Sequence, residues 1–268
     1  MVVSATVRGA RAAAYWVASP FDRFGRHVAG LPSLPPLWLR RHTGAIGAWE
    51  TSARDTADFL GRFELASDAA VVLDVGCGPG AMVEELAKRL PPNGRYVGFD
   101  VHGPSIRWCR RHWSGDSRLT FEHAAVRSAY GAAAGPPVST YRFPLEDGEA
   151  DLVLAKSVFT HLLETDARHY LAEIRRVLRA GRAAVVTAFL FDGDHADIEA
   201  VRRALPFELD GGFVRLRRNG RPTAAVAFER NVFWSMVEDN GLRVIWHSAG
   251  FYPGRSRLDA QDVLILGH

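Results

Sequence analysis

The sequence predicts an α/β fold in which helices cover both faces of a doubly wound, mainly parallel β-sheet. Short apolar runs of strand length alternate with stretches of helical periodicity between residues 71 and 190, which is the pattern of strand–helix–strand units. A glycine-rich turn, GCGPG at 76–80, directly follows the first of these runs. The 268 residues are 47% hydrophobic, which is enough to fill one large core.

The expected elements account for most of the chain after residue 70. Five strands are expected first, at 71–75, 95–99, 119–123, 151–155 and 183–190, with helices at 81–90 and 164–179. A helix at 230–240 and strands at 242–247 and 261–266 follow near the C-terminus. The loop between the last two strands is too short for a helical crossover, so we expect them to pair antiparallel. The result is a seven-stranded, mainly parallel sheet with an antiparallel last strand.

Two regions lie outside this pattern. Residues 1–65 form an N-terminal helical extension, in which LPSLPP at 31–36 separates a first helix from a second near 48–63. Residues 66–268 form the main domain, and 191–229 is an insertion in it that is rich in charge and glycine. Each region is a candidate substrate lid, since loops beyond the carboxyl ends of strands bind ligands in open α/β sheets. Packing or an oligomer contact is the alternative for both.

Charge gives little support to nucleic-acid binding. The formal net charge is only +3 and the basic residues are scattered, whereas nucleic-acid surfaces concentrate them. The densest basic stretch, IRWCRRHW at 106–113, is explained better as an amphipathic helix, because Ile106, Cys109 and Trp113 fall on one side of it. We therefore expect no nucleic-acid partner.

The chain also lacks the signals of membrane, secreted and zinc proteins. No apolar run approaches the ~20 residues of a membrane span, and arginines interrupt the apolar runs near the N-terminus. The two cysteines, Cys77 and Cys109, have no metal-ligand spacing around them. We expect a cytoplasmic protein, monomeric or homodimeric, with no membrane partner and no structural metal.

The glycine turn is a ligand-binding candidate with a carboxylate just upstream. Gly76, Gly78 and Ala81 fit the loose dinucleotide fingerprint, and Asp100 lies about 20 residues beyond, at the end of the second strand. A pyrophosphate prefers a helix terminus without a carboxylate beside it. A cationic ligand, with a sulfonium or ammonium group, would gain from Asp74. A nicotinamide cofactor and a purely structural turn remain the alternatives.

Several segments in order resemble the class I S-adenosylmethionine-dependent methyltransferases, in their bacterial small-molecule, natural-product branch. LDVGCGPG and YVGFD resemble motif I and the acidic end of strand two, and FPLEDGEADLVLAKSVFTHL resembles the strand-four region. EIRRVLRAGRAAVVTAFL and QDVLIL resemble the strand-five region and the last strand. The resemblance covers 66–190 well and 230–266 more loosely. It implies a Rossmann-like fold and transfer of a methyl group from S-adenosylmethionine, which leaves S-adenosylhomocysteine.

The resemblance also implies residue roles. It places eleven residues against the cofactor: Asp74, Gly76, Cys77, Gly78, Gly80, Asp100, Val101, His102, Ile106, Lys156 and Ser157. Asp74 and the backbone near Lys156 would lie at the methionine end, and Asp100 would accept hydrogen bonds from both ribose hydroxyls. Two departures stand out. HAAVRS at 123–128 lacks the acidic residue that many members aim at the adenine amino group, and AGR at 180–182 replaces the usual proline-glycine-glycine.

The acceptor is expected to be a small metabolite, such as a natural product or sugar-type compound, methylated on oxygen or else on nitrogen or carbon. AKSVF at 155–159 replaces the proline-proline-aromatic signature of nucleic-acid amino-methylation in this fold. His161 follows strand four and is the candidate general base, with helix capping or packing as its alternative role. The candidate substrate contacts are Tyr15, Trp16, Tyr130, Phe159 and Phe189. An NAD(P)-dependent oxidoreductase and a cofactor-binding protein without turnover are the competing functions.

Metal-dependent chemistry has weaker support. His161, Asp166 and His169 are the only histidine and carboxylate group close in sequence near the expected site. On a helix, positions 161 and 169 would be ~12 Å apart. We therefore expect direct in-line displacement without a metal.

Overall fold

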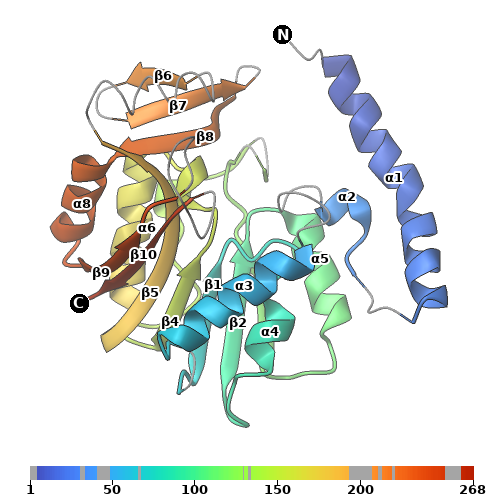
Figure 1. Cartoon of the computed structure of the whole chain (residues 1–268), viewed down its shortest axis with the longest axis horizontal. Helices are drawn as coiled ribbons and strands as arrows, with labels where there is room; N and C mark the ends of the chain where they lie inside the picture. The colour runs from blue at the N-terminus through green and yellow to red at the C-terminus, as the bar shows by residue number, and fades with distance from the viewer. Residues whose placement is uncertain are drawn as a thin grey trace.

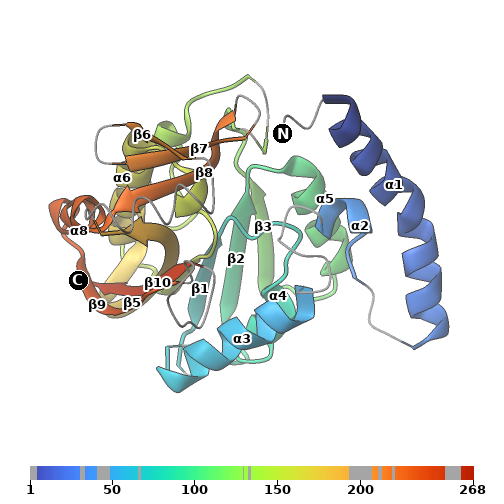
Figure 2. The same cartoon turned by 45° about the horizontal axis from the view of Figure 1, so that its top comes forward.

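The computed structural model describes residues 5–30, 34–40, 49–65, 68–128, 130–131, 134–192, 207–210, 213–218, 221–250 and 261–268. Three helices precede the sheet: α1 (Ala5–Val28), α2 (Leu37–Arg40) and α3 (Trp49–Arg62). Figures 1 and 2 show α1 standing at one side of the molecule, with α2 as its neighbour, whereas α3 lies against the body. In the part of the chain that is described, no helix is long and apolar enough to cross a membrane.

Five parallel strands form the centre of the sheet, in the spatial order β3-β2-β1-β4-β5. They are β1 (Val71–Val75), β2 (Arg95–Asp100), β3 (Leu119–His123), β4 (Ala150–Ala155) and β5 (Leu178–Phe191). β10 (Asp262–Gly267) pairs antiparallel with both β5 and β9 (Arg243–Ser248). The predicted doubly wound sheet with an antiparallel last strand is thus confirmed. The strand order reverses between β1 and β4, which makes their carboxyl ends the place where such sheets bind ligands.

The insertion extends the sheet instead of standing apart from it. Its described residues form β6 (Phe207–Asp210), β7 (Phe213–Arg218) and β8 (Arg221–Glu229). β8 runs parallel to the last three residues of β5, and β6 and β7 continue as an antiparallel meander (Figure 1). The sheet therefore has ten strands among the described residues, not the seven expected. β5 is longer than predicted at both ends, because Leu178 pairs with Ala150 of β4 and Phe191 pairs with Glu229 of β8.

Helices cover both faces of the sheet, as predicted. α4 (Val83–Ala87) and α5 (Gly103–His112) join α3 on one face. α6 (Glu164–Val177) and α8 (Arg230–Asp239) cover the other. β1 illustrates the alternation, since Val72 packs toward the first face and Leu73 toward the second. α4 is shorter than the expected 81–90 because residues 81–82 and 88–90 form turns.

α3 is part of the core even though it belongs to the expected N-terminal extension. Leu60 is completely buried, and Phe59 and Ala53 are also buried in the cluster beneath α3. Phe59 and Phe63 both contact the ring of Trp246 on β9. Residues 49–62 are therefore packed against the sheet.

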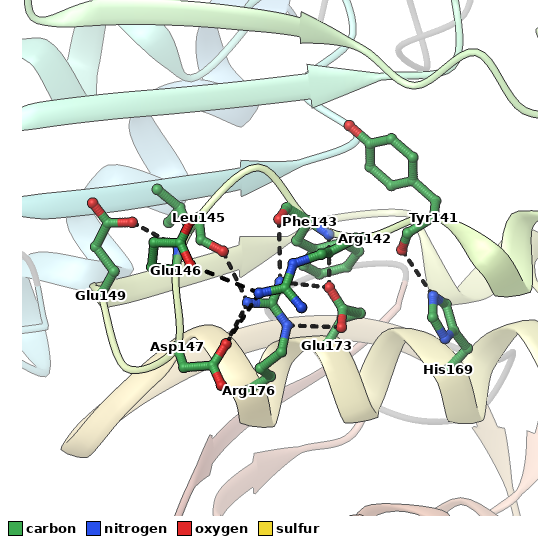
Figure 3. Close-up of polar contacts among 10 residues, drawn as sticks. All are labelled: Tyr141, Arg142, Phe143, Leu145, Glu146, Asp147, Glu149, His169, Glu173 and Arg176. Atoms are coloured by element: carbon green, nitrogen blue, oxygen red, sulfur yellow. Dashed lines mark hydrogen bonds and ion pairs between the residues drawn. The ribbon is translucent and has the colours of Figure 1, made fainter.

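An arginine on α6 fixes the segment that leads into β4 (Figure 3). The Arg176 guanidinium donates to both carboxylate oxygens of Glu173 (2.7 and 2.8 Å) and to the carbonyl oxygens of Phe143 and Leu145. It also donates to Asp147 at 2.9 Å. Glu173 in turn accepts the backbone N–H of Phe143 at 2.6 Å. This network holds the approach to β4 against α6, and thereby positions the residues that follow β4.

Candidate active site

A cavity of about 810 Å³ opens at the carboxyl ends of β1, β2 and β4. Its wall takes residues from the glycine turn (74–82), the end of β2 (99–105), the segment after β3 (127–130) and the segment from β4 into α6 (156–170). These four segments are far apart in sequence and meet because parallel strands end at the same edge of the sheet. The cavity lies at the strand-order reversal, where α/β sheets bind ligands.

The glycine turn brings bare backbone into the cavity wall. Gly76 has φ +70° and Gly78 has φ +55°, a region that residues with a Cβ seldom adopt. A Cβ on Gly76 would lie 2.7 Å from Cγ2 of Val158, closer than a van der Waals contact allows. Both residues line the cavity. The turn therefore requires glycine at Gly76 for packing as well as for its backbone angle.

Asp74 is a buried carboxylate at the end of β1. Its side chain accepts a hydrogen bond from the Tyr96 hydroxyl at 2.6 Å, and the residue is 3% exposed. Burial raises the pKa of Asp74 to about 7, against the opposing effect of the Tyr96 hydrogen bond. The nearby Asp100 carboxylate raises this pKa further and Lys156 lowers it. A cationic ligand in the cavity would meet a carboxylate that burial has left poorly solvated.

Asp100 ties the end of β2 to the glycine turn. Its Oδ2 accepts the backbone N–H of Gly78 at 2.8 Å, and its Oδ1 accepts that of His102 at 2.6 Å. Burial raises the pKa of Asp100, although these two N–H groups act in the opposite direction. A carboxylate has about four lone-pair positions, so each oxygen keeps capacity for a ligand hydroxyl. Asp100 lines the cavity.

The residues after β4 are anchored by polar contacts to other elements. Lys156 donates to the Thr56 hydroxyl on α3 at 2.7 Å. Ser157 has φ +58°, a strained conformation for a residue with a side chain. Its backbone N–H donates to Thr187 on β5 at 2.8 Å, and the Gln261 amide donates to its hydroxyl at 2.9 Å. The strain at Ser157 is thus held by Thr187 on β5 and by Gln261, which directly precedes β10.

His161 and Tyr130 meet at the cavity wall. The Tyr130 hydroxyl lies 3.3 Å from Nδ1 of His161, and the two rings contact edge to face with centroids 4.8 Å apart. They come from different segments, since Tyr130 follows β3 and His161 follows β4. Asp166, at the start of α6, is half-buried in the same wall, and burial raises its pKa against hydrogen bonds from Ser139. This part of the wall combines a histidine, a phenol and a carboxyl group.

The comparisons with known proteins establish the family. A model of the methyltransferase domain matches residues 72–181. Nocamycin O-methyltransferase of Saccharothrix syringae is 30% identical over 203 residues, which are 65% of this chain and 70% of that protein. The chain belongs to the S-adenosylmethionine-dependent methyltransferases. An uncharacterized 37.1 kDa protein in a Streptomyces fradiae transposon is 33% identical over 160 residues, but this methyltransferase covers only 41% of its length.

Solved structures agree with the fold of this methyltransferase. An S-adenosylmethionine-dependent methyltransferase of Methanosarcina mazei matches with a TM-score of 0.54 at 16% identity, over 77% of this chain and 95% of that one. The 1,6-didemethyltoxoflavin-N1-methyltransferase of Burkholderia thailandensis, crystallised with its substrate and S-adenosylhomocysteine, matches with a TM-score of 0.54 at 17% identity. That match covers 85% of this chain and 83% of the other. At these identities the likeness establishes the fold alone.

S-adenosylmethionine is the cofactor that membership of this family implies, and the family match does not favour a nicotinamide cofactor. The cavity fits it chemically. Backbone without a Cβ at Gly76 and Gly78 lies in the same wall as two carboxylates, the buried Asp74 and the half-buried Asp100. Carboxylates suit a ligand that carries an ammonium group, a sulfonium group and hydroxyls.

Most of the residues predicted for this methyltransferase site meet at the cavity. Its wall contains Asp74, Gly76, Cys77, Gly78, Asp100, Val101, His102, Lys156, Ser157, Tyr130 and His161. Other residues that were not expected to contact the cofactor or the acceptor also line it, among them Arg127, Asp166, Tyr170 and Gln261. Arg127 and Gln261 lie in segments that the sequence analysis considered, but nothing in those segments indicates that these two side chains line the cavity.

Six predicted residues of this methyltransferase lie outside the cavity wall in the structure. Gly80 packs against Trp113, whose ring would be 2.5 Å from a Cβ placed there. Ile106 and Phe159 are core residues at 1% and 0% exposure, and the Phe159 ring packs against Phe233. The remaining three lie on other elements: Phe189 within β5, and Tyr15 and Trp16 on α1. Packing therefore accounts for Gly80, Ile106 and Phe159, whereas Trp16 on α1 is 66% exposed.

Proposed function

We propose that this methyltransferase methylates a hydroxyl oxygen of a small metabolite, a natural product or sugar-type compound, with His161 as general base. The observation that carries the proposal is the contact between Tyr130 and His161 in the wall of the cavity that also contains the glycine turn. A histidine has an ordinary pKa near neutrality and can accept the proton of an acceptor hydroxyl. The name of the Saccharothrix relative, an O-methyltransferase, supports oxygen as the methylated atom.

We propose that the carboxylates of Asp74 and Asp100 hold two different parts of the cofactor. Asp74 would face the cationic methionine end, and Asp100 would accept the ribose hydroxyls while it keeps its bonds to Gly78 and His102. The backbone of Gly76 and Gly78 would approach the cofactor closely. Lys156 and Ser157 would border the methionine end, because they follow β4 directly.

In this proposal the protein contributes orientation and proton transfer. The bound sulfonium supplies an activated methyl group for in-line displacement. The bound cofactor would supply its methyl carbon to the acceptor oxygen and leave as S-adenosylhomocysteine, and His161 would take the hydroxyl proton on its imidazole. Alignment of two reactants alone can contribute ~7–11 kcal/mol. Tyr130 acts as a positioning residue that orients the imidazole ring through the 3.3 Å contact.

The division of the chain is also a proposal. The methyltransferase domain would span 66–268, with 191–229 as an insertion and 1–65 as an N-terminal extension. The packing of α3 favours a smaller independent extension, consisting of α1 and α2. Within the insertion, residues 193–206, 211–212 and 219–220 lie outside the described residues.

A product assay tests the proposed base. The purified enzyme is incubated with methyl-labelled S-adenosylmethionine and a panel of hydroxylated metabolites, and methyl ethers are identified by mass and by NMR. His161→Gln should lower kcat on the accepted compound by about 10²–10⁴-fold, with unchanged affinity for S-adenosylhomocysteine. His169→Gln is the matched control, because His169 lies on α6 outside the cavity wall and contacts the Tyr141 carbonyl. Turnover of His161→Gln within a few-fold of wild type would show that His161 is not the base.

A further inference from the structure

α1 presents an apolar stripe to the solvent. Val17, Phe21, Phe24 and Val28 are 67%, 75%, 69% and 70% exposed. Their spacing of four, three and four residues places them on one side of a helix. Figures 1 and 2 show α1 at the side of the molecule, separated from the sheet. Large exposed apolar side chains gathered on one face indicate an interaction site.

The opposite side of α1 faces its own protein. Asp22 forms an ion pair with Arg40 of α2, and Arg40 also donates to the Pro35 carbonyl at 2.8 Å. Ser19, only 9% exposed, lies one turn before Asp22 on this side and donates to the Tyr15 carbonyl. A helix of a water-soluble domain normally buries its apolar side and exposes its polar one. α1 is held in the reverse orientation, so its apolar stripe is directed away from the rest of the chain.

The segment around α1 is strongly basic. Residues 1–49 contain six arginines and one carboxylate, a net charge of +5, whereas the whole chain carries +3. The single carboxylate, Asp22, is already paired with Arg40. On a helical projection, Arg23 and Arg26 fall on the side away from the apolar stripe. An apolar face of phenylalanine and valine with arginines on the other side is the pattern of helices that lie in the surface of a membrane.

We propose that α1 docks this protein on an anionic lipid surface, with Phe21 and Phe24 inserted among the acyl chains. Charge and area both favour lipid over a second copy of the chain. Two copies would bring two segments of net charge +5 together. The stripe has four exposed apolar side chains, whereas a stable protein interface uses about 20–30 residues a side. A bilayer requires no such complementary surface, and anionic headgroups attract the arginines.

This docking differs from the expectation of no membrane partner, which rested on the absence of a segment long enough to span a bilayer. An interfacial helix needs only a stripe of apolar residues, not a continuous apolar run. The inference does not depend on the methyl acceptor or on the proposed role of His161.

Vesicle sedimentation of the full chain tests the proposal. The probes are vesicles of phosphatidylcholine alone and vesicles of equal parts phosphatidylcholine and phosphatidylglycerol. The wild type should bind the anionic vesicles, and added salt should release it. The double variant Phe21→Glu/Phe24→Glu should lower the partition coefficient by about a hundredfold, since burial of each phenylalanine contributes a factor of about ten or more. Arg23→Glu should weaken binding to a smaller extent.

Ile245→Glu is the matched control, because Ile245 is another exposed apolar residue, at 55%, but lies on β9. It should bind vesicles as the wild type does. Circular dichroism and affinity for S-adenosylhomocysteine should be unchanged in every variant, which shows that each has folded. The proposal is overturned if the wild type does not bind anionic vesicles, or if the double variant binds them equally well. It is also overturned if the wild type is a dimer in solution that the double variant converts to a monomer.

Discussion

Replacement of Asp74 by asparagine should stabilise the cofactor-free protein at alkaline pH. The asparagine has nearly the same shape, and its carbonyl oxygen can still accept the Tyr96 hydroxyl that now donates at 2.6 Å. What it removes is the ability of a buried group to become charged. Burial raises the pKa of Asp74 from its ordinary 3.8 to about 7, so the ionised form is the costly one.

The size and the pH window of this effect follow from the two pKa values. Below about pH 3.8 the Asp74 carboxyl is protonated in both the folded and the unfolded chain, and its favourable contribution to the free energy of unfolding is fully present. As pH rises, the unfolded chain releases its proton first, and stability falls until the folded carboxyl also ionises near pH 7. Each pKa unit is worth about 1.4 kcal/mol, so the whole loss is about 4 kcal/mol. Between pH 5 and pH 8 the loss is about 3 kcal/mol.

Urea unfolding at several pH values measures the effect. Tryptophan fluorescence gives the free energy of unfolding of the wild type and of Asp74→Asn, and Asp58→Asn, an exposed carboxylate on α3, serves as the control substitution. The stability of Asp74→Asn relative to wild type should rise by about 3 kcal/mol from pH 5 to pH 8. Packing differences between the two side chains do not depend on pH and cancel. If the difference in the free energy of unfolding between the two proteins stays constant from pH 5 to pH 8, burial does not destabilise the ionised form of Asp74.

Three further substitutions have definite expected outcomes. Asp100→Ala should weaken binding of S-adenosylhomocysteine by at least about tenfold in calorimetry. It should also lower the free energy of unfolding by about 1–3 kcal/mol, because two backbone N–H groups lose their acceptor. Unchanged affinity would remove Asp100 from the site. Arg176→Met should lower the free energy of unfolding in urea by about 2–4 kcal/mol. The Arg142 side chain is 62% exposed, so Arg142→Met should lower it by under about 1 kcal/mol. Equal losses would contradict the role given to Arg176 in the network of Figure 3. Gly76→Ala should cost about 2–4 kcal/mol, from positive φ and the contact with Val158, and a thermally unaltered variant would show that the turn relaxes.

The central fold could be predicted because its information is local. Each parallel strand is a short apolar run, and strand–helix alternation specifies a doubly wound sheet. β6–β8 could not be predicted in the same way. Their place depends on pairing between β8 and the far end of β5, which is a contact between distant segments. α1 is likewise tied to α2 by the ion pair between Asp22 and Arg40, a contact that no periodicity reveals.

The candidate site likewise contains residues that local sequence places and residues that only long-range contacts place. The glycine turn and Asp100 follow their strands directly, so motif spacing places them at the sheet edge. Tyr130 was identified as a substrate candidate, but its contact with His161 joins residues 31 positions apart. Gln261 reaches the cavity only through the antiparallel pairing of β10 with β5. Phe159 was misplaced because an aromatic residue after a strand end can turn either into the pocket or into the core, and packing against Phe233 decides for the core.

Calorimetric titration with S-adenosylhomocysteine, with NAD and NADP on the same protein batch, tests the central claim most directly. We expect one-to-one binding of S-adenosylhomocysteine in the micromolar range, and weaker binding to Asp100→Ala. Titration with NAD or NADP should give no heat of binding. Binding of NAD or NADP with none of S-adenosylhomocysteine would contradict the assignment of the cavity to a methyltransferase site.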